Sequence, residues 1–460
     1  MALNMIQTIN PATEARIQVY TPLTKEESDV CIAEASSRYQ SWRHTSWHER
    51  KQGLLNLAAC LRTGRERYAK LMACEMGKPL KAGRSEIDKC AWVCEHYAEY
   101  GEAYLATEYV DTSMKKSKIC YQPMGVVFAI MPWNFPFWQV FRYAAPTVFA
   151  GNTTILKHAP ISTGTAEAIT ALFLEAGFPP HVFQHIVVEN DVAAAMIAHD
   201  AVIGVTFTGS AHAGSHIAAC AGKHLKRVVL ELGGSDPAVV LEDADIEVAA
   251  RVIVDSRLNN TGQVCIAAKR IIAVKSVMKP LLEAIHRRIQ NYPVGDPLDE
   301  ATVLGPMARA DLRDALHQQV LSSIKKGAKL SLGGVLPKGP GFYYPPTLLT
   351  DVVPGMPAFD EELFGPVIAL IEAEDEAEAI RLANQTEYGL GASVFTRNES
   401  HGEMIATDKL EAGTCFVNGR VSSDPRLPFG GIKRSGIGRE LAREGILAFV
   451  NMKTVGVAYA

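Results

Sequence analysis

Short apolar segments alternate with helical ones from residue 126 onward, and this alternation restricts the possible folds more than any other feature of the chain. The first apolar segments are rich in β-branched residues, which favour strands, and the stretches between them have helical patterns. Such a βαβ order is typical of a parallel sheet that helices cover on both faces. We therefore predict an α/β fold, with its first strands at VVFAIM, TTILK, VFQHIVV, AVIGVTF and RVVLEL.

The alternation starts again after Gly233 and Gly234, which predicts a second α/β domain. A helix is expected over residues 276–292, where apolar residues recur at four-residue spacing. The strands expected in this second domain are PAVVL, RIIAV, VIALI, ASVFT and TCFVN.

Three other segments complete the expected organisation. Residues 47–110 repeat apolar residues at spacings of three and four, which predicts helices. Two segments, KKSKICYQ near residue 115 and the C-terminal NMKTVGVAYA, fit neither domain and are expected to be edge strands used in assembly.

Charge and hydropathy exclude several functional classes. The 460 residues carry a net charge of −4 with no basic block, so nucleic acid is not expected as a partner. No apolar run reaches the roughly 18 residues that a membrane span needs, and the longest candidate, residues 126–138, is interrupted by two prolines. The N-terminus lacks a cationic start followed by an apolar core, so no signal peptide is expected.

The nine cysteines are an odd set with irregular spacing, which favours reduced thiols in a cytoplasmic protein. Cys90 and Cys94 could share one helix face, but they lack a matching second pair, so core packing is favoured over zinc binding. No metal site is predicted.

Cys265 differs from the other cysteines because it follows a turn sequence, Thr261-Gly262-Gln263-Val264. A turn can bring backbone N–H groups near the sulfur, and an accessible thiol in a polar setting can form the reactive thiolate. A lone cysteine is more often a buried structural residue, so the neighbouring motifs decide between the two interpretations.

Three further motifs favour chemistry. In MPWNFPFWQVFR, two prolines force a turn after a strand, which holds Asn134 where α/β sheets bind ligands and where its amide could stabilise an oxyanion. In VVLELGGSDP, Glu231 ends an apolar strand, so partial desolvation would raise its pKa toward that of a general base. In FTGSAHAG, a strand, glycines and a helix start follow one another, a geometry that can bind phosphate.

Taken together, these motifs resemble those of the NAD(P)-dependent aldehyde dehydrogenases. The matching stretches run in family order over nearly the whole chain, and the variants LKHA and ELGGSDP are most similar to those of bacterial succinate-semialdehyde dehydrogenases. The matching stretches are PWNFP, FTGS, ELGG, GQVC, EELFGPV and PFGGIKRSGIGRE.

The resemblance implies an aldehyde dehydrogenase-like fold, with two Rossmann-like α/β domains and a small β oligomerisation arm. Residues 1–114 and 126–233 would form the cofactor-binding domain, and residues 234–434 the catalytic domain. Residues 115–125 and 449–460 would be the oligomerisation strands of a homodimer or homotetramer.

The resemblance also assigns the catalytic roles. Cys265 would attack the aldehyde to form a thiohemiacetal, and Asn134 with the Cys265 backbone N–H would form the oxyanion hole. Hydride transfer to the nicotinamide would leave a thioester, and Glu231 would activate the water that hydrolyses it. The implied reaction is oxidation of succinate semialdehyde to succinate.

The cofactor-binding residues are likewise implied by the resemblance. Pro160 stands where many relatives have the glutamate that holds the ribose 2′-hydroxyl, and proline neither binds that group nor repels a 2′-phosphate. NAD and NADP therefore both stay open, and we favour NAD. The expected contacts are Lys157 and Trp133 near the adenosine, Gly209, Ser210 and Gly214 at the pyrophosphate, and Glu362 and Phe364 at the nicotinamide ribose.

Arg142 is implied as the residue that binds the remote carboxylate of the substrate. From its position alone, a salt bridge to a neighbouring carboxylate is the simpler interpretation. A second arginine found in some relatives is replaced by Asn259, so a second contact is expected from Ser423, with Ser422 and Arg426 as alternatives.

Two further positions leave a role open. Tyr143 stands where the family often has lysine, which puts a proton-relay role in doubt. Glu440 matches a second glutamate near the water path, or is a helix-terminal residue beside Arg439.

Three alternatives remain open. A CoA-acylating or phosphorylating enzyme would not need Glu231 as a base. Another aldehyde, such as glutarate semialdehyde or an aliphatic aldehyde, is a second alternative. A non-catalytic nucleotide-binding homologue is the third, although Cys265, Glu231 and Asn134 are all present.

Overall fold

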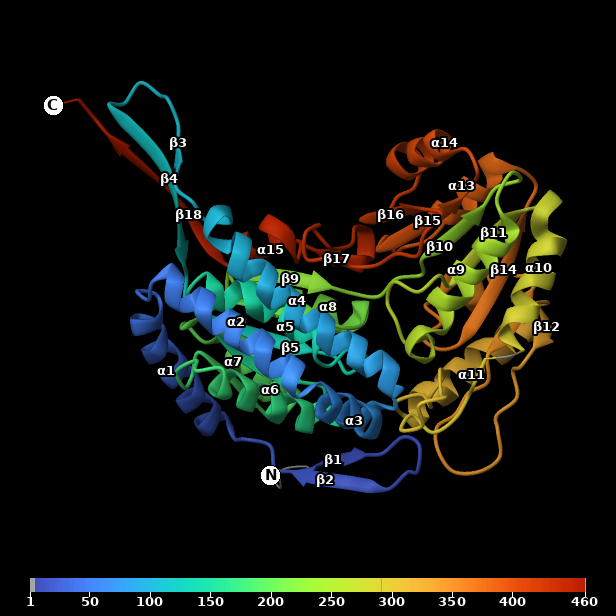
Figure 1. Ribbon diagram of the computed structural model, residues 1–460, viewed down its shortest axis with the longest axis horizontal. Coiled ribbons are helices and arrows are strands. Elements are labelled where there is room, and N and C mark those ends of the chain that lie inside the picture. The colour runs from blue at the N-terminus through green and yellow to red at the C-terminus, as the bar shows by residue number, and fades with distance from the viewer. Residues whose placement is uncertain (1–4, 291, 460) are drawn as a thin grey trace.

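Two sheets flanked by helices make up most of the molecule, and a narrow third sheet projects from one end (Figure 1). The computed structural model describes residues 5–290 and 292–459. Residues 1–4 and 460, which fall in the predicted domain and arm ranges, and residue 291, in the predicted helix over residues 276–292, lie outside the described residues. The α/β fold predicted from the sequence is confirmed.

The first sheet has six strands in the order β17-β9-β8-β5-β6-β7. Its strands pair in parallel, except that β17 runs antiparallel to β9. Four helices connect the parallel strands. The strands are β5 (Val126–Met131), β6 (Thr153–His158), β7 (Phe183–Ile186), β8 (Val202–Thr208), β9 (Arg227–Glu231) and β17 (Gly436–Ile437), and the helices are α5 (Trp138–Phe149), α6 (Thr163–Glu175), α7 (Asn190–Ala198) and α8 (Ala211–Lys223).

Four N-terminal helices pack on this first layer. Capping boxes fix the starts of the first two, with Thr24 and Ser46 each accepting from the backbone N–H three residues on. The prediction of helices alone over residues 47–110 is wrong at its end, because a short exposed strand, β3, follows α4. These elements are α1 (Lys25–Trp42), α2 (Trp47–Thr63), α3 (Arg65–Met76), α4 (Leu80–Tyr104) and β3 (Glu108–Tyr109), preceded by the hairpin β1 (Ile6–Ile9) and β2 (Arg16–Tyr20).

The second sheet has seven strands in the order β12-β13-β14-β11-β10-β15-β16. All its pairs are parallel except β12 with β13. Its strands are β10 (Pro237–Val240), β11 (Arg270–Val274), β12 (Lys329–Leu332), β13 (Thr347–Thr350), β14 (Val367–Ala373), β15 (Gly391–Phe395) and β16 (Thr414–Val417). Its helices are α9 (Ile246–Leu258), α10 (Lys275–Ile289), α11 (Ala310–Lys325), α12 (Pro357–Asp360), α13 (Glu376–Asn384) and α14 (Glu399–Met404).

Helix α10 ends earlier than the sequence predicted. The expected helix over residues 276–292 ends at Ile289, three residues early, and Pro293 follows shortly after. A proline disfavours helical backbone in the residue before it, so a helix usually ends ahead of it.

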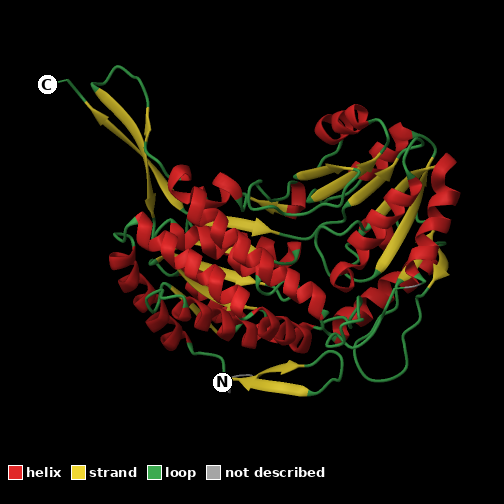
Figure 2. Cartoon of the chain, in the orientation of Figure 1, coloured by secondary structure: helices red, strands yellow, loops and turns green. Residues whose placement is uncertain are grey.

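The third sheet, β18-β4-β3, forms the projecting arm (Figure 2). Strand β4 (Lys116–Pro123) pairs antiparallel along its whole length with β18 (Val450–Val457), from Val450 opposite Pro123 to Val457 opposite Lys116. Both segments were predicted to be strands, and α15 (Ala442–Leu447) leads into the second of them.

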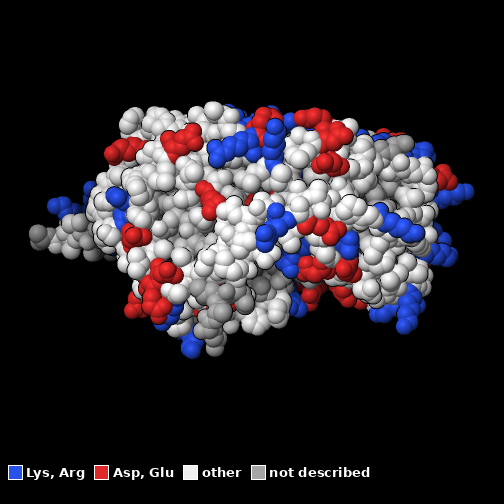
Figure 3. Space-filling view, turned by 90° about the horizontal axis from the view of Figure 1, so that it is seen from below, with Lys and Arg blue, Asp and Glu red and all other residues white. Residues whose placement is uncertain are grey.

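The distribution of charge on the surface and the polarity of the helices agree with what the composition predicted. On the face drawn in Figure 3, Lys and Arg side chains are interspersed with Asp and Glu side chains rather than gathered in one patch. Across the part of the chain that the structure describes, every helix is too short or too polar to cross a bilayer.

Candidate active site

A cavity of about 450 Å³ lies beside Cys265, lined by residues of α4, α5, α9 and the loop after β16. Among the residues expected from the sequence, Cys265, Arg142 and Ser423 line it. Asn134 and Glu231 do not line it, and both are buried. The volume suits a small substrate.

The loop before Cys265 has an unusual backbone. Asn260, Thr261 and Gly262 all have positive φ, at 49°, 57° and 71°. A β-branched residue in this region is strained, at a cost of about 1 to 3 kcal/mol. Gly262 is required here, because a Cβ at that position would lie 2.2 Å from the carbonyl oxygen of Gly365. This loop, rather than the simple turn expected, presents the thiol.

Side chains from distant segments hold this loop in place. Asn260 Nδ2 donates to the carbonyl oxygen of Asn134 at 2.7 Å, and Thr261 Oγ1 donates to that of Gly305 at 3.1 Å. The buried Arg257 guanidinium donates to the carbonyl oxygen of Gly262 at 3.1 Å. Hydrogen bonds of this kind can offset the backbone strain.

Lys269 links the nucleophile loop to Glu362. Its Nζ donates to the carbonyl oxygens of Val264 at 2.9 Å and Cys265 at 2.6 Å. The same Nζ lies 3.3 Å from Glu362 Oε1, which also accepts from the Gly234 backbone N–H at 3.1 Å. Lys269 is 1% exposed, and these contacts hold its ammonium in place at the nucleophile loop.

Opposing influences act on the Cys265 thiol. Burial raises its pKa to about 12, and the carboxylates of Glu362 and Asp236 add to the rise. The positive charges of Lys269 and Arg142 oppose it. A thiolate at neutral pH therefore depends on these two cations and on whatever else binds beside the sulfur.

Asn134 is held by hydrogen bonds on both sides of its amide. Its Nδ2 donates to the carbonyl oxygen of Gln263 at 2.9 Å, and its Oδ1 accepts from Gln139 Nε2 at 3.1 Å. These bonds fix which end of the amide is the donor. One of the two N–H groups on Nδ2 remains for another acceptor.

Glu231 is buried at the end of β9, and neither of its carboxylate oxygens has a hydrogen-bond partner in the described structure. Burial raises its pKa well above the usual range, and nearby Glu440 adds to this, while Arg142 and Arg439 oppose it. A carboxyl group that lacks partners in this way is suited to exchange a proton with a water molecule.

Arg142 forms an ion pair with Glu440, and both side chains are buried. Its Nη2 also donates weakly to Thr208 Oγ1 at 3.4 Å, and its guanidinium lies 4.9 Å from the centre of the Phe429 ring. The salt bridge that the sequence left open is therefore present, and Arg142 still lines the cavity. Glu440 is therefore paired with Arg142. The next residue, where the family often has lysine, is the uncharged Tyr143.

Ser423 lies at the cavity, with its Oγ accepting from Lys89 Nζ at 2.8 Å. Ser422 also lines the cavity. Arg426, the third residue considered, is exposed and pairs instead with Asp424 at 2.7 Å. Of the three residues expected to make a second contact with the substrate carboxylate, Ser422 and Ser423 therefore remain candidates.

Residues expected to hold the cofactor lie around the start of α8. Ser210 caps this helix, with its Oγ accepting from the Ala213 N–H at 3.2 Å. Gly214 lets the helix pack closely, because a Cβ there would lie 2.4 Å from Leu232. The Gly209 N–H donates to the carbonyl oxygen of Glu231 at 3.0 Å.

The remaining expected cofactor residues fit a dinucleotide chemically. Trp133 and Phe364 meet edge to face, with ring centres 5.9 Å apart. Lys157, at the end of β6, has no hydrogen bond or ion pair within the described residues, and burial lowers its pKa. A free ammonium, a capped helix N-terminus and the Glu362 carboxylate are groups that could bind ribose and phosphate.

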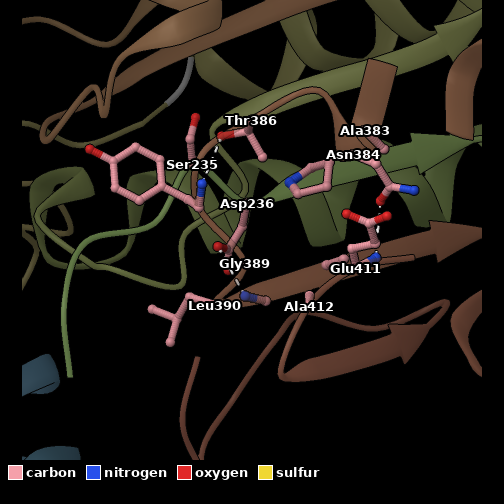
Figure 4. Close-up of a pocket in the computed structure, with 13 residues that line it drawn as sticks. Ser235, Asp236, Ala383, Asn384, Thr386, Gly389, Leu390, Glu411 and Ala412 are labelled. Atoms are coloured by element: carbon pink, nitrogen blue, oxygen red, sulfur yellow. Dashed lines mark hydrogen bonds between the residues drawn. The ribbon is translucent and has the colours of Figure 1, made fainter. Parts of the chain in front are cut away.

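A second, much smaller pocket is lined in part by Asp236, Asn384 and Glu411 (Figure 4). Asp236 Oδ1 accepts from the Gly391 N–H at 3.1 Å, and burial raises the pKa of this carboxyl group to about 7. At about 10 Å³ the pocket has room for one water molecule at most. It is therefore no substrate site.

Sequence reasoning missed Lys269, Lys89 and Gln139. Lys269 follows Cys265 by four residues in CIAAKR, and that short spacing was the one available signal. In the described ranges, residues 5–290 and 292–459, no group of three or more His, Cys, Asp or Glu side chains is arranged to hold a metal ion.

Comparison with known proteins gives consistent matches over the whole chain. The model of the aldehyde dehydrogenase family matches residues 2–455. A probable NADP(+)-dependent succinate-semialdehyde dehydrogenase of Synechocystis sp. is 46% identical, covering 98% of this chain and 100% of that protein. The NAD(P)+-dependent succinate semialdehyde dehydrogenase Sad of Escherichia coli K12 is 44% identical, covering 97% and 96%.

A solved structure agrees with these sequence matches. The crystal structure of a succinic semialdehyde dehydrogenase from Streptococcus pyogenes, in complex with NADP+, superimposes with a TM-score of 0.96 at 35% identity. The match covers 99% of this chain and 100% of that one. The chain is therefore a member of the aldehyde dehydrogenase family.

Proposed function

We propose that this protein oxidises succinate semialdehyde to succinate with NAD+ or NADP+. The observation that carries the proposal is the cavity that contains Cys265 together with the cations Arg142 and Lys89. A thiol suits an aldehyde carbon, and positive charge suits the carboxylate at the other end of the same substrate. The names of the relatives from Synechocystis and Escherichia coli support this substrate.

In the first step, the Cys265 thiol loses its proton to water, its sulfur bonds to the aldehyde carbon, and the carbonyl oxygen becomes an oxyanion. The remaining N–H of Asn134 is available to stabilise that oxyanion, since its other N–H is committed to Gln263. The bound cofactor supplies the hydride acceptor. The loss of hydride from the thiohemiacetal leaves Cys265 as a thioester.

In the second step, water hydrolyses the thioester. Glu231 takes a proton from the water, which attacks the acyl carbon, and the bond to the Cys265 sulfur breaks to release succinate. Because burial favours the neutral form of Glu231, this step should quicken as the pH rises and the carboxylate forms. Because Glu231 can act as a base toward water, we favour hydrolysis of the thioester over acyl transfer to CoA or phosphate.

The proposal extends to the choice between NAD+ and NADP+. Pro160 lines a small pocket with Lys157 and presents no carboxylate that would exclude a 2′-phosphate. Acceptance of NADP+ as well as NAD+ fits this arrangement, and relatives named for NADP+ support it. The expectation that NAD+ is preferred stays a prediction.

Assembly and location are also proposals. The arm of β3, β4 and β18 has exposed apolar residues such as Met452 and Val457, which supports its use as the strand pair of a homodimer or homotetramer. All nine cysteines are free thiols, which supports a cytoplasmic location.

A panel of aldehydes, assayed with NAD+ and with NADP+, tests the function. We expect succinate semialdehyde to have a higher kcat/KM than glutarate semialdehyde and butanal, with no requirement for CoA. Cys265→Ala should abolish oxidation. A strong preference for butanal, or a dependence on CoA, would replace this substrate or this reaction with one of the alternatives.

A further inference from the structure

Lys89 on α4 occupies an unusual setting for a lysine. Its Nζ donates to Ser423 Oγ at 2.8 Å and lies 4.2 Å from the centre of the Trp138 ring. All three residues line the cavity that contains Cys265. Among the described residues, Lys89 has no carboxylate within ion-pair distance. Its ammonium therefore lies at the cavity without an ion-pair partner in the described structure.

The carboxylates that line this cavity are committed elsewhere. Glu86 forms an ion pair with the buried Lys78 and accepts from the backbone N–H groups of Phe137 and Trp138, each at 2.9 Å. Asp255 accepts from Tyr292 Oη at 3.3 Å. Neither carboxylate neutralises Lys89.

The other cations of the cavity differ from Lys89. Arg142 is already paired with Glu440. Arg420 and Lys81 also line the cavity, but both are exposed and can be solvated by water. Lys89 is the half-buried cation of this set, and it is held in place by a serine and an aromatic ring. A ligand with a negative charge would complete its contacts.

We propose that Lys89 is a specificity-determining residue that binds the carboxylate of the semialdehyde substrate, with Ser423 holding the ammonium in position. This inference rests on the proposed succinate-semialdehyde activity and assigns the recognition of the carboxylate to a residue of α4. Arg142, which is shared with Glu440, contributes positive charge to the same cavity.

Four charged or titratable groups from three segments face Lys89 and affect its protonation. Burial lowers the pKa of Lys89 to about 8, and the positive charges of Arg142 and Arg420 lower it further. Cys90 on the same helix and Asp424 raise it. A substrate carboxylate would raise it too, so binding of the carboxylate and protonation of Lys89 should favour each other.

Substitution tests the assignment. Lys89→Met should lower kcat/KM for succinate semialdehyde by about 10- to 100-fold, the loss expected for one charge-assisted contact. It should change kcat/KM for butanal by less than about threefold, because butanal has no carboxylate. Lys89→Arg should retain most of the preference, and Ser423→Ala should lose part of it. Lys51→Met, which removes an exposed lysine of α2, is the matched control for net charge.

A pH profile of the wild-type protein gives a test that needs no variant. The ratio of kcat/KM for succinate semialdehyde to kcat/KM for butanal cancels the titration of Cys265 and Glu231, which both substrates share. We expect this ratio to fall as the pH rises through about 8, where Lys89 loses its proton. In Lys89→Arg the ratio should stay level over the same range.

The outcomes separate this inference from the proposed function. A wild type that oxidises butanal as well as succinate semialdehyde would overturn both. A wild type that prefers succinate semialdehyde, with equal losses on both substrates in Lys89→Met or a level pH ratio, would overturn the role of Lys89 alone. Should Lys89→Met fail to fold, the wild-type pH ratio and Lys89→Arg still decide.

Discussion

Lys269 and Glu362 form an ion pair with 3.3 Å between Nζ and Oε1, and the same ammonium holds the carbonyl oxygen of Cys265 at 2.6 Å. The proposed nucleophile and the proposed ribose-binding carboxylate thus share one charged group. Lys269 lowers the pKa of the thiol, whereas Glu362 raises it. Replacing either Lys269 or Glu362 should therefore change the pKa of the Cys265 thiol.

Lys269→Met should reduce the reactivity of Cys265. Loss of the neighbouring positive charge would leave less thiolate, so we expect the rate of alkylation by iodoacetamide at pH 8 to fall about tenfold, the equivalent of one pKa unit. Glu362→Gln should have the opposite effect and speed alkylation. Lys275→Met, at an exposed lysine paired with Glu374, is the control. Equal alkylation rates in all three variants would contradict the coupling.

Glu231→Gln should slow hydrolysis of the thioester more than its formation. A pre-steady-state burst of reduced nicotinamide should therefore survive while steady-state turnover collapses. In the wild type, turnover should rise with pH, because burial raises the pKa of Glu231 and the base must be ionised. Stopped-flow absorbance across a pH series measures both. Burst and turnover falling together would mean that Glu231 acts before hydride transfer.

Arg142→Leu should affect both stability and specificity. It would leave Glu440 as a buried, unpaired carboxylate, at a cost of about 3 to 5 kcal/mol in the free energy of unfolding. Because Arg142 also lowers the pKa of the Cys265 thiol, the variant should slow oxidation of both succinate semialdehyde and butanal. The loss in kcat/KM should be roughly 10- to 100-fold greater for succinate semialdehyde, because butanal has no carboxylate.

The double variant Arg142→Leu with Glu440→Leu separates these two effects. It should regain most of the stability, because no buried charge is left unpaired, yet it should remain poor on succinate semialdehyde. Denaturant unfolding and steady-state kinetics measure the two quantities. Restored selectivity in the double variant would show that Arg142 acts only through the fold.

Pro160→Glu should shift cofactor preference toward NAD+. A carboxylate beside Lys157 could accept from the ribose 2′-hydroxyl and would repel a 2′-phosphate. The ratio of kcat/KM with NAD+ to that with NADP+ measures the shift. An unchanged ratio would place the adenosine ribose away from Pro160.

Local patterns predicted the strands well, because buried parallel strands are continuous apolar runs. The hairpin of β1 and β2 and the strand β12 were missed, since their residues are mostly exposed and follow no clean alternation. The buried strand β13 was missed as well, because only Leu348 and Leu349 of its four residues are apolar. The antiparallel β17 has only two residues, and its place beside β9 depends on a return of the chain that no local pattern records.

For the site, family resemblance identified residues, but it could not give their contacts. Glu440 lies far along the chain from Arg142, so their ion pair follows from the tertiary fold alone. Lys89 resembles any other lysine of an amphipathic helix until the fold places it beside Ser423. The backbone strain at Thr261 is likewise set by long-range hydrogen bonds.

The pairing of β17 with β9 affects how the first sheet folds while the chain is still being synthesised. The strand that carries Glu231 remains an open edge of the first sheet until residues 436–437 are added, after the whole second sheet has been synthesised. During translation the ribosome therefore releases the first layer with an unpaired, apolar edge strand, a site where chains can associate wrongly. Residues 436–437 close that edge, so truncation of the chain before residue 436 should harm solubility as well as assembly.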